Sequence, residues 1–357
     1  MNLLVYGGCH ALILKRLIDE LGPQGRHHVT LLINFQVVAS GKPFPYEKLR
    51  DYDVVIYSPI QNKGDYNTSF LEEACEECGV PTICFPWLEW HGHSPGADKD
   101  WFWGHHGWYF PALVELSREF WDCSAFSRFV RAEYPSQEAI QTYFADTTRR
   151  LKEQEQAFDC QVKISDFVLD NYHDRRMFLT PDHPTLVLYR YVVNEIENLV
   201  GTRLVASWPS DLPELQPEER TPILPRIAAE TQLTFADTTW RSETQPLVTM
   251  DLDGFLALHF QAGRRALSQG EGVETVLATA ARPTWVGSPR HSAADEGPVA
   301  VPIFTQVLMR RAAPTAGQAY FDGEILATLT DHPPLDAVPR SVDGWCRFRS
   351  DDWTFRS

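Results

Sequence analysis

The first twenty-odd residues constrain the fold of this chain more than any other stretch. Four apolar residues, Leu3 to Tyr6, predict a buried strand, and the glycine pair at 7 and 8 permits a tight turn. Apolar residues then recur at helical spacing from 12 to 21, before Gly22-Pro23. Cys9 therefore lies where a strand ends and a helix begins. Backbone N–H groups at such a position lower a thiol pKa and can bind an oxyanion, although a free cysteine in a turn is also a common packing residue.

The same strand and helix pattern continues over the next eighty residues. Apolar runs at 28–35, 53–58 and 82–85 predict three more strands, residues 70–78 predict a helix, and residues 36–41 are typical of a loop. This alternation favours an α/β fold with a parallel sheet, whose ligands bind beyond the carboxyl ends of the strands. Polar residues predicted at these ends are Cys9, Gly41, residues 58–62 and residues 86–93.

The remainder of the chain combines an aromatic segment, several helices and a different C-terminal texture. Residues 86–111 contain five tryptophans and four histidines, and we expect a functional loop there. Helical patterns occur at 112–121, 136–146, 146–158, 164–171, 185–200 and 251–260. Short apolar runs at 273–278, 299–309 and 320–329 favour strands. We therefore predict one domain over residues 1–263 and an extension, rich in β structure, over residues 264–357.

Charge and cysteine content exclude some classes of partner. The chain has 32 basic and 48 acidic residues and a net charge of −16, so we exclude nucleic acid and anionic membrane surfaces as partners. It has no run of about eighteen apolar residues, which predicts no membrane insertion. The N-terminus lacks the pattern of a secretory signal, and the seven cysteines form no even framework, so we expect a cytoplasmic protein.

Cys9 and His183 are the best-placed pair for chemistry. His183 lies in Pro181-Asp182-His183-Pro184, just ahead of the predicted helix at 185–200. A nucleophile after the first strand and a histidine before a late helix is an order found in α/β folds that transfer acyl groups. The alternative is that Asp182 only caps the helix and His183 is an ordinary loop residue.

Two other clusters invite a metal interpretation. The histidines of the aromatic segment form HxH and HH pairs, but their spacing matches no compact zinc signature, so we predict no metal. Cys75 and Cys78 lie on a predicted helix without a second CxxC, and we interpret them as packing residues.

Four motifs in a fixed order resemble the WcbI-type polysaccharide-biosynthesis acetyltransferases. Residues 5–11 (VYGGCHA) are similar to the family's GNCQ element, and residues 53–60 (DVVIYSPI) to its DvvIyQP strand. Residues 86–95 (PWLEWHGHSP) resemble its loop between two prolines, and residues 178–185 (FLTPDHPT) resemble its lFyTxNHP element. The resemblance covers about residues 1–200.

This resemblance implies an SGNH/GDSL-like three-layer α/β/α sandwich that binds coenzyme A or acetyl-CoA and transfers an acyl group to a sugar hydroxyl in polysaccharide or capsule assembly. Cys9 would take the nucleophile position and His183 the base position, either deprotonating Cys9 or activating the acceptor hydroxyl. Asp182 and His10 are further catalytic candidates. The implied oxyanion-hole residues are Gly8, Gly41 and Asn62. Candidates for binding coenzyme A are Gly7, Gly8, Ser58, Gln61, Arg128 and Arg131. Candidates for binding the substrate are Trp87, Trp90, His91 and His93.

The sequence also departs from the family pattern. The motif asparagine and glutamine are Gly8 and His10 here, and Thr180 stands where the SGNH fold has an aspartate three residues before its histidine. We therefore expect a Cys/His dyad rather than a full triad. Two alternatives stay open: an SGNH-type esterase in which water replaces the acceptor, and a non-catalytic glycan-binding protein in which Cys9 is structural.

Overall fold

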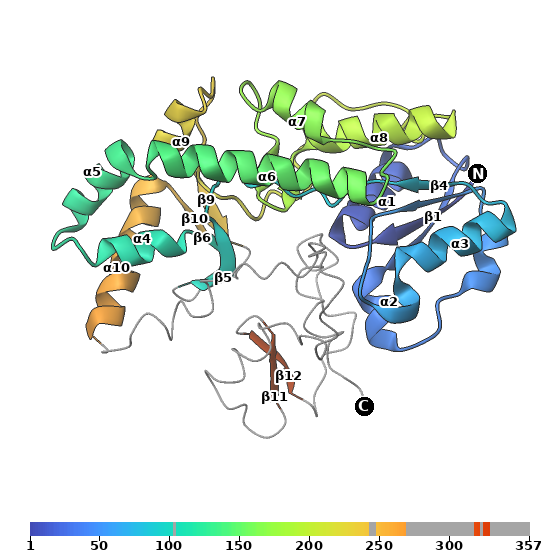
Figure 1. The fold of residues 1–357 in the computed structure, drawn as a ribbon, viewed down its shortest axis with the longest axis horizontal. Coiled ribbons are helices and arrows are strands. Elements are labelled where there is room, and N and C mark those ends of the chain that lie inside the picture. The colour runs from blue at the N-terminus through green and yellow to red at the C-terminus, as the bar shows by residue number, and fades with distance from the viewer. Residues whose placement is uncertain (103–104, 243–247, 269–317, 322–323, 329–357) are drawn as a thin grey trace.

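A four-stranded parallel sheet forms the N-terminal part of the computed structural model (Figure 1). Its strands are β1 (Asn2–Gly7), β2 (His28–Ile33), β3 (Val54–Tyr57) and β4 (Thr82–Cys84), in the order β2-β1-β3-β4. The structure describes residues 1–102, 105–242, 248–268, 318–321 and 324–328. The chain runs from β1 outward to β2 on one side and places β3 on the other. A sheet wound in this way opens a crevice between the carboxyl ends of β1 and β3.

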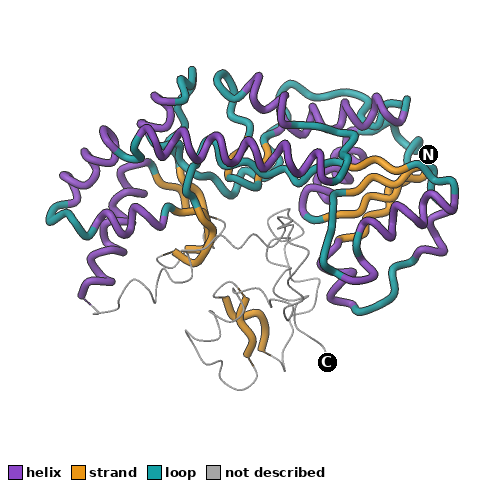
Figure 2. Tube along the Cα trace, viewed as in Figure 1, coloured by secondary structure: helices purple, strands orange, loops and turns teal. Residues whose placement is uncertain are grey.

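Helices cover both faces of this sheet (Figures 1 and 2). Leu3 and Val5 share a core with α1 (Cys9–Leu21) and α8 (Leu186–Val200). Leu4 and Tyr6 point to the opposite face, into a core that includes α3 (Thr68–Cys78). The alternation along β1 therefore buries the strand on both sides, as expected for a parallel sheet. The predicted α/β fold with a parallel sheet is confirmed.

Short elements complete this part, which we call the sheet lobe. They are α2 (Asn34–Ser40), the 3₁₀-helices η1 (Tyr46–Asp51) and η2 (Gly64–Tyr66), α7 (Ser165–Asn171), β7 (Phe178–Thr180) and β8 (His183–Pro184). The longer helices α3 and α8 end at Gly79 and Gly201, whose φ angles of 72° and 73° suit glycine.

A second lobe lies at the other end of the molecule (Figure 1). Its elements are β5 (Asp98–Phe102), β6 (His105–Tyr109), α4 (Pro111–Ser117), α5 (Cys123–Glu133), α9 (Pro225–Glu230), β9 (Trp240–Ser242), β10 (Val248–Met250) and α10 (Leu252–Ser268). Phe110, Phe126 and Phe255 belong to its separate core. The two lobes share α6 (Gln137–Ala157), which contributes Ile140 to this core and Leu151 to the core of the sheet lobe. With 21 residues, α6 is about 31 Å long.

Several predicted boundaries are wrong. The predicted loop at 36–41 is mostly helix, because α2 starts directly after β2 at Asn34. The segment 86–111 is not a structureless loop, since residues 98–102 and 105–109 pair through their main chains as the antiparallel hairpin β5–β6. The two helices predicted on either side of residue 146 are one helix, α6, because no glycine or proline interrupts residues 137–157.

The C-terminal predictions are only partly within the described residues. Helix α10 continues past the predicted boundary at residue 263 and ends at Ser268. The strand predicted at 320–329 corresponds to an antiparallel hairpin of β11 (Gln318–Phe321) and β12 (Glu324–Thr328). The strands predicted at 273–278 and 299–309 lie outside the described residues, and the β-rich extension stays a prediction.

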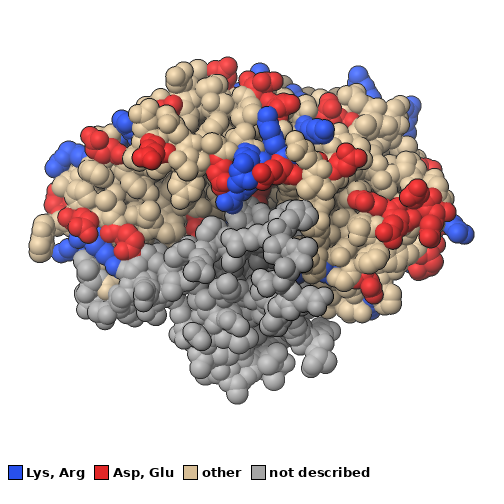
Figure 3. Space-filling view, viewed as in Figure 1, with Lys and Arg blue, Asp and Glu red and all other residues tan. Residues whose placement is uncertain are grey.

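The surface reflects the acidic composition (Figure 3). Acidic side chains gather over α3, and basic side chains gather where α6 crosses this face, beside acidic ones. Arg149 on α6 pairs with Asp146 and Glu153, as expected for the solvated face of a helix. Within the described ranges, no helix has both the length and the apolar character needed to cross a membrane.

Candidate active site at the carboxyl end of the sheet

Cys9 is the first residue of α1 and follows directly on the end of β1. The turn between them is tight, since a Cβ at Gly7 would lie 3.1 Å from the Cβ of Ala11 and 3.4 Å from that of Ser58. Gly8 forms the N-cap, and no side chain among the described residues caps this helix start. The Cys9 side chain is half-buried. The thiol therefore lies at the positive end of a 13-residue helix, beside the crevice between β1 and β3.

His10 connects this turn to the hairpin that carries Asp182 and His183. Its Nε2 lies 2.8 Å from the main-chain oxygen of Asp182, and because a carbonyl only accepts, Nε2 carries the proton. Burial lowers the pKa of His10, and the hydrogen bond to Asp182 only partly opposes that shift. His10 is therefore a neutral donor that holds two segments, far apart in the sequence, next to each other.

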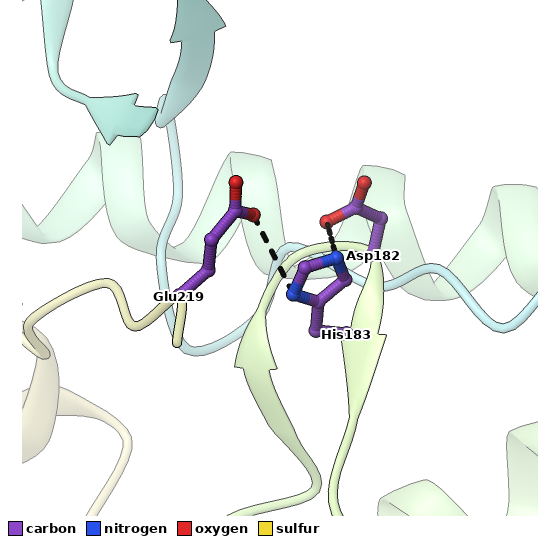
Figure 4. Close-up of side chains that lie close together, drawn as sticks. All are labelled: Asp182, His183 and Glu219. Atoms are coloured by element: carbon purple, nitrogen blue, oxygen red, sulfur yellow. Dashed lines mark ion pairs between the residues drawn. The ribbon is translucent and has the colours of Figure 1, made fainter. Parts of the chain in front are cut away.

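His183 is buried and lies between two carboxylates (Figure 4). Its Nδ1 is 3.4 Å from Oε2 of Glu219, and its Nε2 is 3.9 Å from Oδ1 of Asp182. Thr180, opposite His183 on β7, donates to Oδ1 of Asp182 at 2.7 Å. Burial acts to raise the pKa of Asp182, but the charges of His183 and Lys99 and the bond from Thr180 outweigh it and hold the pKa well below its usual range.

Glu219 is the functional candidate that sequence reasoning missed. Its side chain is fully buried, and its Oε1 lies 2.8 Å from Nζ of Lys99 on β5. Main-chain pairing brings it to the site, because Thr221 N–H donates to the oxygen of Leu179 on β7. The Arg176 guanidinium donates to both the Leu179 and Thr221 oxygens and so holds the two segments together. No motif spacing marks Glu219, since it lies in a proline-rich stretch after α8.

The other residues proposed for the oxyanion hole (Gly8, Gly41 and Asn62) and for coenzyme A (Ser58 and Gln61) occupy different environments. Ser58 is buried at the end of β3, where its N–H donates to the oxygen of Tyr6 at 3.0 Å. Gln61 and Asn62 are exposed, and Gly41 ends α2 in the left-handed region at φ 61°. The side chain beside Gly8 is that of Asn34 at the start of α2, whose Oδ1 would be 3.8 Å from a Cβ at Gly8. The strand predicted at 28–35 included Asn34, so no signal in the sequence marked this position.

Two of the four proposed substrate residues are core residues. Trp90 is 1% exposed, and its ring contacts those of Phe144, Tyr172 and Phe178. His93 is 3% exposed and lies beside Trp90, and burial lowers its pKa to about 3. Neither side chain offers an open face to a ligand, because the predicted loop folds back onto the sheet lobe.

The other two residues of this set, Trp87 and His91, are partly exposed. His91 Nε2 lies 3.3 Å from Oε1 of Glu89, and burial raises the pKa of Glu89. The charge of Asp182 raises it further, which places Glu89 in the electrostatic surroundings of the site. The N–H of Trp90 donates to the oxygen of Pro181 at 2.8 Å, so this segment and the His183 hairpin are joined.

The arginines proposed for coenzyme A lie elsewhere. Arg128 and Arg131 are on α5 in the second lobe, at the opposite end of the molecule from α1 (Figure 1). Arg131 pairs with Asp253 at 2.7 Å. The structure therefore does not bring these two residues together with Cys9.

Asp182, His183 and Glu219 also form a group of the kind that could bind a metal. One possible ligand atom from each lies within 4.8 Å of the others. The Lys99 ammonium, 2.8 Å from Glu219, already provides positive charge beside this carboxylate. The chain itself therefore offsets part of the negative charge of this group.

Comparison with known proteins bears on this geometry. The family model described as polysaccharide biosynthesis enzyme WcbI matches residues 2–204, more than half of the chain. The chain belongs to this family. The WcbI match includes Cys9, His10 and the Asp182-His183 hairpin, and it ends before Glu219. The resemblance inferred from the four motifs is confirmed at the level of the family.

A solved structure supports the fold. It is described as WcbI, a novel polysaccharide biosynthesis enzyme, in native form without a disulfide bond between coenzyme A and one of its cysteines. It is 16% identical to this chain with a TM-score of 0.56, and the match covers 78% of this chain and 94% of that one. Among proteins with curated descriptions, none matches.

Proposed function

We propose that this WcbI-family chain is a coenzyme A-dependent acyltransferase that moves an acyl group, such as acetyl, onto a hydroxyl of a sugar or similar acceptor. The observation that carries the proposal is the hydrogen bond from His10 to Asp182, which holds the Cys9 turn beside the His183 hairpin. The family description as polysaccharide biosynthesis enzymes supports the acceptor class. The solved WcbI structure is described by the absence of a disulfide between coenzyme A and one of its cysteines, and this association with coenzyme A supports the donor.

We further propose that the sheet lobe is SGNH/GDSL-like. Four parallel strands in the order β2-β1-β3-β4 with helices on both faces support this assignment. The nucleophile candidate after β1 and the histidine just before α8 occupy the corresponding places in the chain order. A cytoplasmic location remains a prediction from composition.

The residues around Cys9 suit a thioester donor. Gly8 has no side chain, so a substrate can approach the turn closely there, whereas Gly7 packs against Ala11 and Ser58. The first turn of α1 carries the positive end of the helix dipole, which stabilises an oxyanion or a phosphate. Ser58 and Gln61 follow β3 on the other side of the crevice and stay candidates for contacts to coenzyme A. Arg128 and Arg131 are not supported for this role by their place on α5.

The chemistry divides into two transfers with balanced atoms. Cys9 Sγ attacks the thioester carbonyl, the bond from carbon to the coenzyme A sulfur breaks, and the proton of the Cys9 thiol passes through His183 to that sulfur. The acceptor hydroxyl then attacks the Cys9 thioester, and His183 takes its proton and returns it to the Cys9 sulfur. Backbone N–H groups at the start of α1 stabilise the negative oxygen in both steps.

Calorimetry and intact-mass measurement test this proposal. Coenzyme A and acetyl-CoA are titrated into the wild type and Cys9→Ala, and micromolar binding corresponds to about −8 kcal/mol. We expect binding by both proteins, and one acetyl group on the wild type after acetyl-CoA treatment but none on Cys9→Ala. Cys123→Ala is the matched control, because Cys123 is also partly exposed but lies on α5.

Other outcomes are equally informative. The absence of binding heat and of any thermal shift with both ligands would overturn the coenzyme A proposal. Turnover of an acetyl ester without coenzyme A would indicate the esterase alternative. Transfer from acetyl-CoA that survives Cys9→Ala would show that the acceptor attacks the thioester directly.

A further inference from the structure

We infer that Glu219 positions His183 and sets its protonation, with Lys99 as the opposing charge. This inference rests on the proposed role of His183 as the base of an acyl transfer. It adds an acidic partner that the motifs of the chain do not contain, since Thr180 stands at the expected aspartate position. It also places a residue beyond the family-matched range, 2–204, in contact with the proposed base.

The three side chains form a buried charged row. Nδ1 of His183 lies 3.4 Å from Oε2 of Glu219, and Nζ of Lys99 lies 2.8 Å from Oε1 of Glu219 and 2.9 Å from its Oε2. The side chains of Glu219, His183 and Lys99 are 0%, 4% and 15% exposed. An ionised carboxylate buried this deeply is costly unless positive partners compensate it, and among the described residues Lys99 and His183 lie beside it.

The contact between Glu219 and Nδ1 determines which nitrogen of His183 can act as the base. A carboxylate facing Nδ1 favours the tautomer with the proton on Nδ1, which leaves Nε2 with a lone pair. Nε2 lies on the side of Asp182, whose main-chain oxygen is bonded to His10 of the Cys9 turn. The base nitrogen is therefore the one nearer to Asp182, and the carboxylate of Glu219 lies on the opposite, Nδ1 side of the ring.

Lys99 has an opposite effect to Glu219. Among the described residues, Asp182 and Glu219 lie beside the His183 ring, His10 is close enough to interact with it electrostatically, and Lys99 pairs with Glu219. Two carboxylates this close stabilise the imidazolium form, in which the ring cannot accept a proton. The ammonium on β5 offsets part of their charge, so the ring can be neutral at working pH. Because Lys99 belongs to the second lobe, that lobe contributes directly to the site.

Substitutions of the two residues should therefore shift His183 in opposite directions. The full chain, labelled with ¹³C at histidine Cε1, is titrated by NMR, and the His183 signal is identified by its loss in His183→Asn. In Glu219→Gln we expect the His183 pKa to fall by about one to three pH units, and in Lys99→Met we expect it to rise. Glu219→Asp, which keeps the charge, should restore most of the shift.

Surface variants on α6 provide matched controls. Glu153→Gln and Lys152→Met make the same chemical changes at ion pairs exposed to solvent, and they should leave the His183 titration unchanged. If the two substitutions acted only by destabilising the fold, they would not shift the His183 pKa in opposite directions. If Glu219→Gln fails to fold in thermal melts, the direction of the Lys99→Met shift decides the inference by itself.

Kinetics provide the second readout. In single-turnover acetylation by acetyl-CoA, we expect the acidic limb of the Glu219→Gln rate profile to move to lower pH and the plateau to fall, by up to about 10⁴-fold. The KM for acetyl-CoA should stay unchanged. If Glu219→Gln and Lys99→Met bind coenzyme A and become acetylated but show an unchanged His183 pKa, the inference on Glu219 is overturned and the proposed function is not. Opposite shifts in a chain that binds no coenzyme A would instead overturn the proposed function and leave the Glu219 contact established.

Discussion

The hydrogen bond from His10 Nε2 to the main-chain oxygen of Asp182 is the contact on which the proposed site most depends. His10→Leu removes the donor and places an apolar side chain of similar size beside Tyr189. The ring centroids of His10 and Tyr189 are 6.5 Å apart. The carbonyl of Asp182 is then left without this donor in a partly buried place, which costs about 1–3 kcal/mol. His10→Gln keeps an N–H donor, and the family motif has glutamine at this position, so its loss should stay below about 1 kcal/mol.

Urea unfolding at pH 7.5 measures both variants against the wild type. We expect a lower midpoint for His10→Leu at an unchanged slope, because the surface exposed on unfolding is nearly the same. His27→Leu is the control, since His27 Nε2 also bonds to a carbonyl, that of Arg203 at 2.9 Å, but in an exposed place. Its loss should be within about 0.5 kcal/mol.

Acetylation of Cys9 provides the functional half of this test. Displacement of the Cys9 turn from the His183 hairpin by about 1 Å would slow transfer by about 10²-fold. We therefore expect His10→Leu to be slow and His10→Gln to be near the wild type. A His10→Leu protein with wild-type stability and wild-type acetylation would refute the reasoning, because the bond would then hold nothing in place.

Three other predictions concern core and surface residues. Burial lowers the pKa of His93 and of His259 to about 3. Below pH 6.5 the unfolded chain therefore binds protons at these histidines that the folded chain does not bind. We expect the free energy of unfolding to fall by about 2 kcal/mol per histidine between pH 7 and pH 5. Urea unfolding at pH 7 and pH 5 checks this, and His259→Gln should lose less between the two. Trp90→Ala should cost about 3–5 kcal/mol and leave coenzyme A affinity unchanged, whereas lost affinity at full stability would return Trp90 to a ligand role. Arg131→Ala removes a pair with Asp253 and should leave calorimetric affinity for coenzyme A within about twofold, and a tenfold loss (about 1.4 kcal/mol) would place that ligand near α5.

The parts of the fold that sequence reasoning predicted are those determined by local patterns. The continuous apolar run of β1 indicated a buried strand. The helical spacing of apolar residues predicted α8, and Gly201 predicted where this helix ends. The order of the strands was not accessible, because it depends on which edge each crossover reaches. The hairpin β5–β6 was missed because it contains Asp, Lys and Gly, which are depleted in strands, within a segment interpreted as one long loop.

Of the candidate site residues that the structure brings together, the sequence predicted only those that lie in the four motifs. Cys9 and His183 stand at element boundaries that the pattern marks, but Glu219 is one of several acidic residues in a proline-rich segment. Its place depends on main-chain pairing between Thr221 and Leu179, which no spacing in the sequence encodes. Trp90 is 1% exposed, which a tryptophan count could not predict, because such a count does not distinguish a ring that stacks on a ligand from one that fills a core.

The departures from the family motif gain a common explanation from the structure. Where the motif has asparagine, the chain has Gly8, and the amide of Asn34 lies beside it. Where the motif has glutamine, His10 supplies a neutral N–H donor to the hairpin. Where the related fold has an aspartate before the histidine, Glu219 faces Nδ1 from another segment. We therefore propose that polar groups from other places in the chain, Asn34, His10 and Glu219, take the places of the residues that the motifs of this chain lack.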